Sequence, residues 1–220
     1  MRPKISAIIP AYNEADRIGD TVKHTLPFAD EVIVVDDGSQ DDTFLKAKAA
    51  GGKTIKLKKN MGKGFAVLSG FILSKGDIIL FLDADIGSTA IEGKKLLQPI
   101  LRGEADMTIG VLPFGKGGFG FVLGLSRLGI MMLTGRKLEA PISGQRALRR
   151  EVLSNFPWER GFGLETVLTI HAIRNGFKVK EVPIKMEHRR TKKDLRGFIH
   201  RGRQFFSILI GLTKCLLRSL

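Results

Sequence analysis

Short apolar runs that end in polar residues recur through the first half of the chain. Ile5–Ile9 is followed by Pro10, Glu31–Val35 by two aspartates, and Asp77–Leu82 by an aspartate pair spaced by one residue. Each run has the length and the aliphatic or β-branched content of a buried strand. We therefore predict three buried strands, the first stopped by its proline, each with polar residues beyond its carboxyl end.

The segments between these runs have the pattern of amphipathic helices. From Asp16 to Leu26, apolar residues recur four positions apart, which places them on one helical face. Further helices are predicted over 43–50 and 65–74, and further strands over 53–57, 107–111 and 181–184. This alternation predicts an α/β fold with a mainly parallel, twisted sheet flanked by helices on both faces.

The polar clusters are expected to meet at one edge of that sheet. Ligands of open parallel sheets bind beyond the carboxyl ends of the strands. Pro10–Glu14, Asp36–Ser39 and Asp83–Asp85 all follow such ends. The sequence therefore predicts that three distant segments line one crevice.

Asp83 and Asp85 have the arrangement of a metal site. Side chains two positions apart in an extended segment point the same way, so both carboxylates can reach one ion. Carboxylate oxygens suit Mg²⁺ or Mn²⁺, which would neutralise a diphosphate. Alone, such a pair is more often a solvated turn, but its position after a strand and beside two other polar clusters favours function.

Two other motifs leave a structural alternative open. Asp36 and Asp37 end a strand although aspartate is a poor strand residue, and the alternative is an ordinary Asp-Gly turn. Lys63 lies between two glycines at the expected start of a helix, where a lysine and backbone amides can meet phosphate. The alternative there is a plain turn with a solvated lysine.

Composition and charge restrict the class of protein. The 220 residues suit one substantial domain, for which we predict residues 1–190, followed by a basic, amphipathic helical tail over 191–220. The net charge of +14 favours phosphorylated substrates, polyanions or an anionic membrane surface as partners. A nucleic-acid partner is not expected, since the single Tyr12 and single Trp158 form no aromatic and basic binding motif. The lone Cys215 suggests a cytoplasmic location.

The tail suggests contact with a membrane. Its apolar residues fall on one helical stripe: Phe205, Ile208, Leu209, Leu212 and Leu216. After a basic stretch, this stripe predicts a helix lying on the anionic cytoplasmic face of a membrane. The alternative is a helix packed on the sheet or on a second subunit, giving a homo-oligomer. Residues 113–135 are expected to form a loop and an apolar helix, either core or the lining of an acyl-chain groove.

Taken together, the ordered motifs resemble family 2 glycosyltransferases. The residues of the resemblance are Pro10-Ala11-Tyr12-Asn13-Glu14, Val34-Val35-Asp36-Asp37-Gly38-Ser39, Asn60, Gly62-Lys63-Gly64 and Asp83-Ala84-Asp85. The segments Ser143-Gly144-Gln145-Arg146-Ala147 and Glu181–Ile184 further resemble the polyprenyl-phosphate (dolichyl-phosphate) mannose and glucose synthase branch. The match covers roughly residues 4–190 and implies the GT-A type of fold.

The resemblance also implies roles for these residues in binding a nucleotide sugar. The nucleoside pocket would be lined by Pro10, Ala11, Tyr12, Glu14, Asp37 and Lys63. The segment Asp83-Ala84-Asp85 would address the ribose, the diphosphate and a divalent cation, Mg²⁺ or Mn²⁺. The family inverts configuration, so an α-linked donor would give a β-linked product.

One departure from the branch concerns the metal. The branch usually has a glutamine after its aspartate pair, whereas this chain has Ile86-Gly87-Ser88. His188 is the predicted third ligand, because related members that act on small phosphorylated acceptors use a histidine at a comparable place. The alternative is a surface histidine within a basic run.

The acceptor can be one of two classes, which need different chemistry. An alcohol needs a general base, for which the resemblance implies Glu165, whereas a phosphate is already a nucleophile. We place Asp85, Glu165 and Arg146 at the reacting centre. The residues expected to bind the acceptor are Ser143, Gln145, Arg146, Arg189 and Arg190, with Arg149 as a further candidate for a phosphate. The favoured reading is hexose transfer from a UDP- or GDP-sugar to polyprenyl phosphate; the alternative is a soluble acceptor such as a phosphoglycerate.

Overall fold

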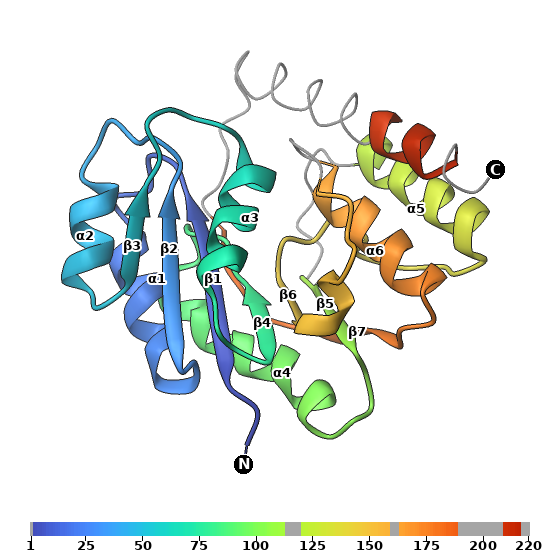
Figure 1. The fold of residues 1–220 in the computed structure, drawn as a ribbon, viewed down its shortest axis with the longest axis horizontal. Coiled ribbons are helices and arrows are strands. Elements are labelled where there is room, and N and C mark those ends of the chain that lie inside the picture. The colour runs from blue at the N-terminus through green and yellow to red at the C-terminus, as the bar shows by residue number, and fades with distance from the viewer. Residues whose placement is uncertain (1, 113–119, 159–162, 189–208, 217–220) are drawn as a thin grey trace.

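A computed structural model describes residues 2–112, 120–158, 163–188 and 209–216 (Figure 1). Its centre is one seven-stranded sheet with the order β3-β2-β1-β4-β6-β5-β7. The strands are β1 (Ile5–Ala11), β2 (Glu31–Asp36), β3 (Lys53–Lys56), β4 (Ile78–Phe81), β5 (Met107–Val111), β6 (Arg146–Arg149) and β7 (Val179–Pro183). Among these, β6 alone runs antiparallel to both of its neighbours. The sheet is therefore mainly parallel, as predicted.

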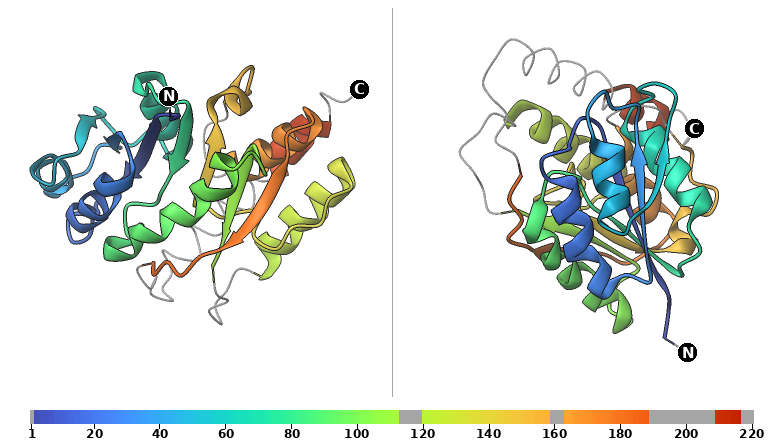
Figure 2. Two further views of the ribbon diagram at one scale, coloured as in Figure 1. Left: turned by 90° about the horizontal axis from the view of Figure 1, so that it is seen from below. Right: turned by 90° about the vertical axis from the view of Figure 1, so that its left-hand side faces the viewer.

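Helices cover both faces of the sheet (Figure 2). The helices on one face are α1 (Ile18–Thr25), α2 (Thr43–Ala49) and α4 (Gly93–Leu101), and those on the other are α3 (Lys63–Leu73) and α6 (Leu164–Arg174), with α5 (Gly120–Thr134) packed against α6. Each face of the sheet has its own core, and successive strand residues alternate between them. Ile9 lies in the core on the α1, α2 and α4 face, and Ile8 lies in the core on the α3 and α6 face. Both faces of each central strand are thus buried, which explains the uninterrupted apolar runs.

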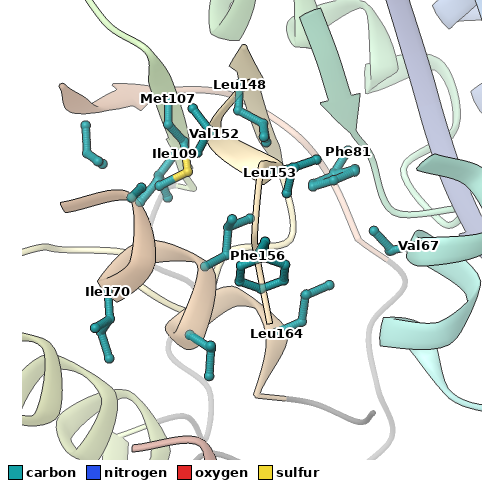
Figure 3. Close-up of a cluster of buried hydrophobic side chains, with 14 of the residues drawn as sticks. Val67, Phe81, Met107, Ile109, Leu148, Val152, Leu153, Phe156, Leu164 and Ile170 are labelled. Atoms are coloured by element: carbon teal, nitrogen blue, oxygen red, sulfur yellow. The ribbon is translucent and has the colours of Figure 1, made fainter. Parts of the chain in front are cut away.

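The core on the α3 and α6 face contains the buried apolar side chains drawn in Figure 3. It joins Val67 of α3, Phe81 of β4 and Leu164 of α6, which are 1%, 5% and 3% exposed. These three residues lie within four positions of Lys63, Asp83 and Glu165 respectively. Packing of the core therefore sets the relative positions of three chemically important side chains.

The predicted strands are confirmed, but Pro10 does not stop the first one. β1 continues to Ala11, and Pro10 pairs in register with Val35 of β2. On the other side, pairing with β4 ends at Ile8. The missing N–H of Pro10 is tolerated because that side of β1 has lost its partner strand.

Two elements are not among those predicted. α4 contains Pro99 in its interior and has no side-chain hydrogen bond at its N-cap, so the usual signals of a helix start are missing. β6 is four residues long, and three of its residues are buried. A strand this short gives no periodic signal in the sequence.

Residues 209–216 form a helix that packs on the domain (Figure 1). A methyl group on Gly129 of α5 would lie 2.5 Å from the Leu212 side chain, and one on Gly211 would lie 2.8 Å from Val167 of α6. Arg174 also donates to the Cys215 carbonyl at 2.7 Å. Of the predicted apolar stripe, Leu212 is buried against the domain, which favours the alternative of a packed helix, while Leu209 and Leu216 are exposed.

Several predictions fall outside the described residues. They include Phe205 and Ile208 of the stripe and the boundary predicted between 190 and 191. The apolar helix expected within 113–135 is confirmed as α5, while 113–119 is not described. Within the described residues, the structure contains no helix with the length and hydropathy needed to span a bilayer.

Candidate active site

The polar clusters converge at one edge of the sheet, as predicted. Ala11 of β1 pairs with Asp36 of β2, and Ile8 pairs with Phe81 of β4, so all three strands end on the same side. Asp37 and Asp83 follow directly beyond these ends. The position of the site thus follows from parallel pairing of three strands.

Asp37 organises the loop that leads into α3. Its two carboxylate oxygens accept hydrogen bonds from the backbone N–H groups of Met61 and Gly62, at 2.7 and 2.9 Å. Gly38 has φ of 78°, and a side chain there would come within 2.6 Å of the Lys59 backbone. Burial raises the pKa of Asp37, and the two amide hydrogen bonds only partly offset this effect. The predicted Asp-Gly turn therefore also holds the loop before α3 in place through two hydrogen bonds.

Lys63 bridges two carboxylates from different parts of the chain. Its Nζ lies 2.8 Å from Asp83 Oδ1 and 2.9 Å from Glu165 Oε1. Burial lowers the pKa of Lys63, but the charges of both carboxylates raise it by more, so the pKa lies above its ordinary value. The Lys63 ammonium group thus joins the start of α3 to the loop after β4 and to the start of α6.

Gly144 makes this close approach possible. A methyl group at its Cα would lie 2.5 Å from Lys63 Nζ and 2.7 Å from Asp83 Oδ1. These distances are shorter than van der Waals contact, so any larger residue would push the ion pair apart. The predicted acceptor segment therefore forms a wall of the site beside Lys63.

Asp83, Asp85 and His188 together fit a divalent cation. They form a group whose possible ligand atoms all lie within 4.8 Å of one another. His188 Nδ1 is 3.1 Å from Asp85 Oδ1, and its Nε2 is buried with no hydrogen-bond partner among the described residues. Two carboxylates and an imidazole are ligands that Mn²⁺ and Mg²⁺ sites use. His188 therefore lies where the sequence placed a third ligand.

The surroundings also determine the charge of this group. Burial lowers the pKa of His188, but its hydrogen bond to Asp85 and the charges of both aspartates raise it by more. Burial raises the pKa of Asp83, but the charge of Lys63 and that of His188 outweigh this, and the net pKa lies below its ordinary value. The aspartate therefore stays ionised at neutral pH, as a metal ligand must.

Arg17 and Thr21, at the start of α1 and within it, hold the loop that contains Asp83 and Asp85. The sequence pattern did not predict this role. Thr21 Oγ1 donates to the Ala84 carbonyl and accepts from the Gly87 amide, each at 2.8 Å. Arg17 Nη1 donates to the Asp85 carbonyl at 3.1 Å. The only sequence signal was a threonine within the apolar face of a predicted helix.

The guanidinium group of Arg146 is held by internal hydrogen bonds. Its side chain is 1% exposed, and its three nitrogens donate to the Ser143 carbonyl, the Pro141 carbonyl and Thr169 Oγ1 at 2.6–2.8 Å. Burial lowers the pKa of Arg146 to about 10, which leaves it charged at neutral pH. The arginine thus fixes the 141–143 segment from beneath, in place of the predicted direct contact with acceptor phosphate.

Arg149 lies at the opposite end of β6 from the site, beside the first residue of β4. Because β6 is antiparallel to β4, Arg146 pairs with Phe81 at the site while Arg149 pairs with Ile78 at the far end. Both arginines were candidates for binding an acceptor phosphate, and the reversed strand separates them. Arg189 and Arg190, the other predicted acceptor ligands, lie outside the described residues.

The remaining predicted residues line the same edge in different ways. Tyr12 is 43% exposed, whereas Ala11 is 3% exposed. The Glu14 amide donates to Thr43 Oγ1 at 2.8 Å, which ties this loop to α2. Pro10 borders a small cavity together with Lys63, Gly144, Arg146 and Glu165. Their predicted contacts with a nucleoside remain predictions.

Comparison with known proteins identifies relatives of this architecture. The family model described as "Glycosyl transferase family 2" matches residues 6–156. Glucosyl-3-phosphoglycerate synthase of Mycolicibacterium paratuberculosis is 31% identical over 193 residues, with 76% of this chain and 59% of the relative covered. Dolichol-phosphate mannosyltransferase of Pyrococcus furiosus is 31% identical over 215 residues, with 88% and 60% covered. The chain thus spans about three fifths of the length of these relatives.

Solved structures show the same fold. A structure of glucosyl-3-phosphoglycerate synthase from Mycobacterium tuberculosis in complex with Mn²⁺, uridine-diphosphate and phosphoglyceric acid has a TM-score of 0.83 and 27% identity, with 97% of this chain and 78% of that chain covered. Another, in complex with Mg²⁺ and uridine-diphosphate, also has a TM-score of 0.83, with 25% identity and 97% and 79% covered. The predicted fold class is confirmed. From its motifs, its fold and a family model matching more than half of its length, this chain belongs to glycosyl transferase family 2.

Proposed function

We propose that the protein transfers a hexose from a UDP-sugar to a hydroxyl group of a small phosphorylated acceptor, such as a phosphoglycerate, with the help of a divalent cation. The observation that carries this proposal is the position of Glu165. Its carboxylate is held 2.9 Å from Lys63, which also contacts Asp83 of the metal group. A hydroxyl can donate a hydrogen bond to such a carboxylate, whereas an attacking phosphate oxygen would be repelled by it.

On the donor side, each group has a distinct task. Asp83, Asp85 and His188 would hold Mg²⁺ or Mn²⁺, which supplies positive charge to the leaving diphosphate. The loop that Asp37 holds through the Met61 and Gly62 amides would bind the base, and the N-terminus of α3 would lie beside the phosphates. The glucosyl-3-phosphoglycerate synthase structures with uridine-diphosphate and Mn²⁺ or Mg²⁺ support this assignment.

On the acceptor side, Glu165 would act as the general base. The proton of the acceptor hydroxyl passes to Glu165 as the oxygen bonds to the anomeric carbon, and the bond to the diphosphate oxygen breaks. UDP leaves with the negative charge that this bond cleavage generates. Glu165 is in the first turn of α6, and its side chain is 12% exposed, which limits access of bulk water to the transferred proton.

The substitution Glu165→Gln tests the proposal. With 3-phosphoglycerate as acceptor, we expect kcat to fall by about 10²- to 10⁴-fold, because the base is removed. Glu104→Gln is the matched control, since Glu104 is a surface carboxylate paired with Lys180. The rate of UDP release gives kcat for both variants. Unchanged kcat in Glu165→Gln would contradict the role of base.

Polyprenyl phosphate is the second candidate acceptor. Relatives named dolichol-phosphate mannosyltransferase and, in Dictyostelium discoideum, dolichyl-phosphate beta-glucosyltransferase favour it. The latter is 32% identical over 126 residues. This acceptor needs no base, so Glu165→Gln should then retain activity in detergent micelles that contain the lipid. The two candidates therefore predict opposite results with the same variant.

The stereochemical course stays a prediction from the family resemblance. Direct displacement on an α-linked donor gives a β-linked product, because the acceptor attacks from the face opposite the leaving diphosphate. Proton NMR of the product measures the coupling constant at the anomeric carbon. An α-linked product would contradict direct displacement.

A further inference from the structure

Gln145 makes two hydrogen bonds to the same residue, Asp83. Its Nε2 donates to Asp83 Oδ2 at 2.6 Å, and its Oε1 accepts from the Asp83 backbone amide at 3.2 Å. Only one orientation of the side-chain amide satisfies both contacts, since a carboxylate needs a donor and an N–H needs an acceptor. Gln145 therefore contacts both the main chain and the side chain of one predicted metal ligand.

The glutamine is itself held rigidly. Its side chain is fully buried, and the Gly110 amide of β5 donates to the backbone carbonyl of Gln145 at 2.8 Å. A methyl group on Gly110 would lie 3.1 Å from the Gln145 Cβ, so the absence of a side chain there lets the glutamine approach β5. A buried side chain with both polar atoms paired loses little freedom when it orients a neighbour.

The direction of β6 places the glutamine at the site. Gln145 precedes the first residue of β6, and Arg146 pairs with Phe81, two residues before Asp83. A parallel strand in this position would bring its last residue, and not its first, to this edge of the sheet. The residue before an antiparallel strand can therefore reach the residues that follow β4.

The two oxygens of Asp83 are bound by different donors. Lys63 occupies Oδ1 at 2.8 Å, and Gln145 occupies Oδ2. A carboxylate oxygen accepts two hydrogen bonds or ligand contacts, so with respect to the described residues each keeps a lone pair available in a defined direction. Partners of this kind around metal-binding carboxylates orient them, and their loss weakens metal binding.

We propose that Gln145 is a positioning residue that fixes the Asp83 carboxylate for binding a divalent cation. This assignment rests on the metal site of the proposed function. It replaces the expectation that Gln145 touches the acceptor, because a fully buried side chain with both polar atoms on Asp83 is not available to one. Gln145 acts through Asp83 and has no contact of its own with substrate.

Gln145→Met tests the proposal, because methionine keeps the length of the side chain and removes both hydrogen bonds. We expect the Kd for Mn²⁺, measured by electron paramagnetic resonance of free Mn²⁺ without nucleotide, to rise by about 10- to 100-fold. The Kd for UDP in EDTA should not change. Thr108→Val is the matched control: Thr108 is equally buried on the neighbouring β5, and its hydroxyl donates to the Leu96 carbonyl.

The outcomes separate this proposal from the proposed function. Wild-type protein that binds neither Mn²⁺ nor UDP would overturn the proposed function and this inference with it. Wild-type protein that binds both, with Mn²⁺ affinity equal in Gln145→Met and Thr108→Val, would overturn the inference alone. If Gln145→Met does not fold, the shorter Gln145→Asn takes its place, and the same weakening of Mn²⁺ binding is expected.

A double-mutant cycle shows whether the effect passes through Asp83. In an Asp83→Ala background, Gln145→Met should cause no further loss of Mn²⁺ affinity, because the carboxylate that it orients is gone. Additive losses would overturn the proposal, since they would mean that Gln145 affects the cation independently of Asp83. A purely structural role would lower the melting temperature of both Gln145→Met and Thr108→Val without this coupling.

Discussion

Lys63 donates a 2.8 Å hydrogen bond to Asp83, which joins the first residue of α3 to the loop after β4. The same ammonium group contacts Glu165 at 2.9 Å. Two carboxylates this close would repel each other without a shared cation. The arrangement thus places one ammonium group between a proposed metal ligand and a proposed base.

Lys63→Met should weaken UDP binding and destabilise the fold. Loss of one charged hydrogen-bond donor costs about 1.5–3 kcal/mol, or about 10- to 100-fold in affinity. Since Lys63 lowers the pKa of Asp83, its stabilisation is present at neutral pH and is lost as pH falls through the lowered pKa. Calorimetry and urea unfolding at pH 7 and pH 3 measure these effects. Lys95→Met, which removes a surface pair with Glu92, should change little.

Gly144→Ala should reduce donor binding without unfolding the protein. The added methyl group would lie 2.5 Å from Lys63 Nζ and 2.7 Å from Asp83 Oδ1, and both are ends of side chains that can move. The ion pair would be displaced, and the metal and diphosphate sites with it. Gly124→Ala is the control, because among the described residues no atom outside its own helix backbone and chain neighbours lies within 4 Å of its added methyl group. Equal Kd values for UDP with Mn²⁺ in the two variants would contradict this account.

Asp37 should make nucleotide binding sensitive to acid. Burial raises the pKa of Asp37, so its carboxylate gains a proton at a higher pH than an exposed aspartate does. The protonated form accepts the Met61 and Gly62 amides less well, and UDP affinity should fall as pH decreases through the raised pKa. Asp37→Asn should bind UDP weakly and with less dependence on pH. Titration calorimetry from pH 4 to 8 distinguishes the two profiles.

His188 should make Mn²⁺ binding stronger as pH rises. Its hydrogen bond to Asp85 and the charges of both aspartates overcome the effect of burial and raise its pKa above 6.5. A proton and a metal ion compete for the imidazole, so Mn²⁺ affinity should fall as pH decreases through the raised pKa. His188→Ala should bind Mn²⁺ more weakly and lose most of this dependence. His24→Ala, at an exposed histidine on α1, should behave as the wild type does.

Leu212→Ala should destabilise the domain although Leu212 belongs to the C-terminal helix. Leu212 is 9% exposed and packs on Gly129 of α5, so its truncation should cost about 2–4 kcal/mol. Leu216 of the same helix is 53% exposed, and Leu216→Ala should change the free energy of unfolding by less than about 0.5 kcal/mol. Urea unfolding compares the variants. Equal stabilities would mean that the helix does not pack on α5 in solution.

The positions of Asp37, Lys63 and Asp83 could be predicted because each follows from local pattern. They lie directly beyond a buried strand or at the start of a helix, and parallel pairing brings such positions together. His188 needed the family resemblance as well. His188 Nδ1 lies 3.1 Å from Asp85 Oδ1 because the segment after β7 runs back to the site, and the sequence pattern alone does not give the path of that segment.

The surroundings of Arg146 and Gln145 could not be predicted in the same way. Both are polar residues in a motif, and the sequence does not show whether a polar side chain points outward or is buried with internal partners. The answer depends on the direction of β6, which is set by pairing with β5 and β4, whose partner residues lie 37–41 and 65–71 positions earlier in the chain. The prediction that Arg149 binds an acceptor phosphate beside Arg146 failed for the same reason.

The reversed strand also marks the place where two parts of the chain meet. Asp37, Lys63 and Asp83 come from the parallel units before it, whereas Glu165 and His188 come from segments that follow it. Their contacts meet across the seam between β4 and β6. A change in the helix that carries Glu165 leaves β1, β2 and β4 paired as before, so that helix can adapt to a new co-substrate, whereas a change at His188 alters the metal group as well.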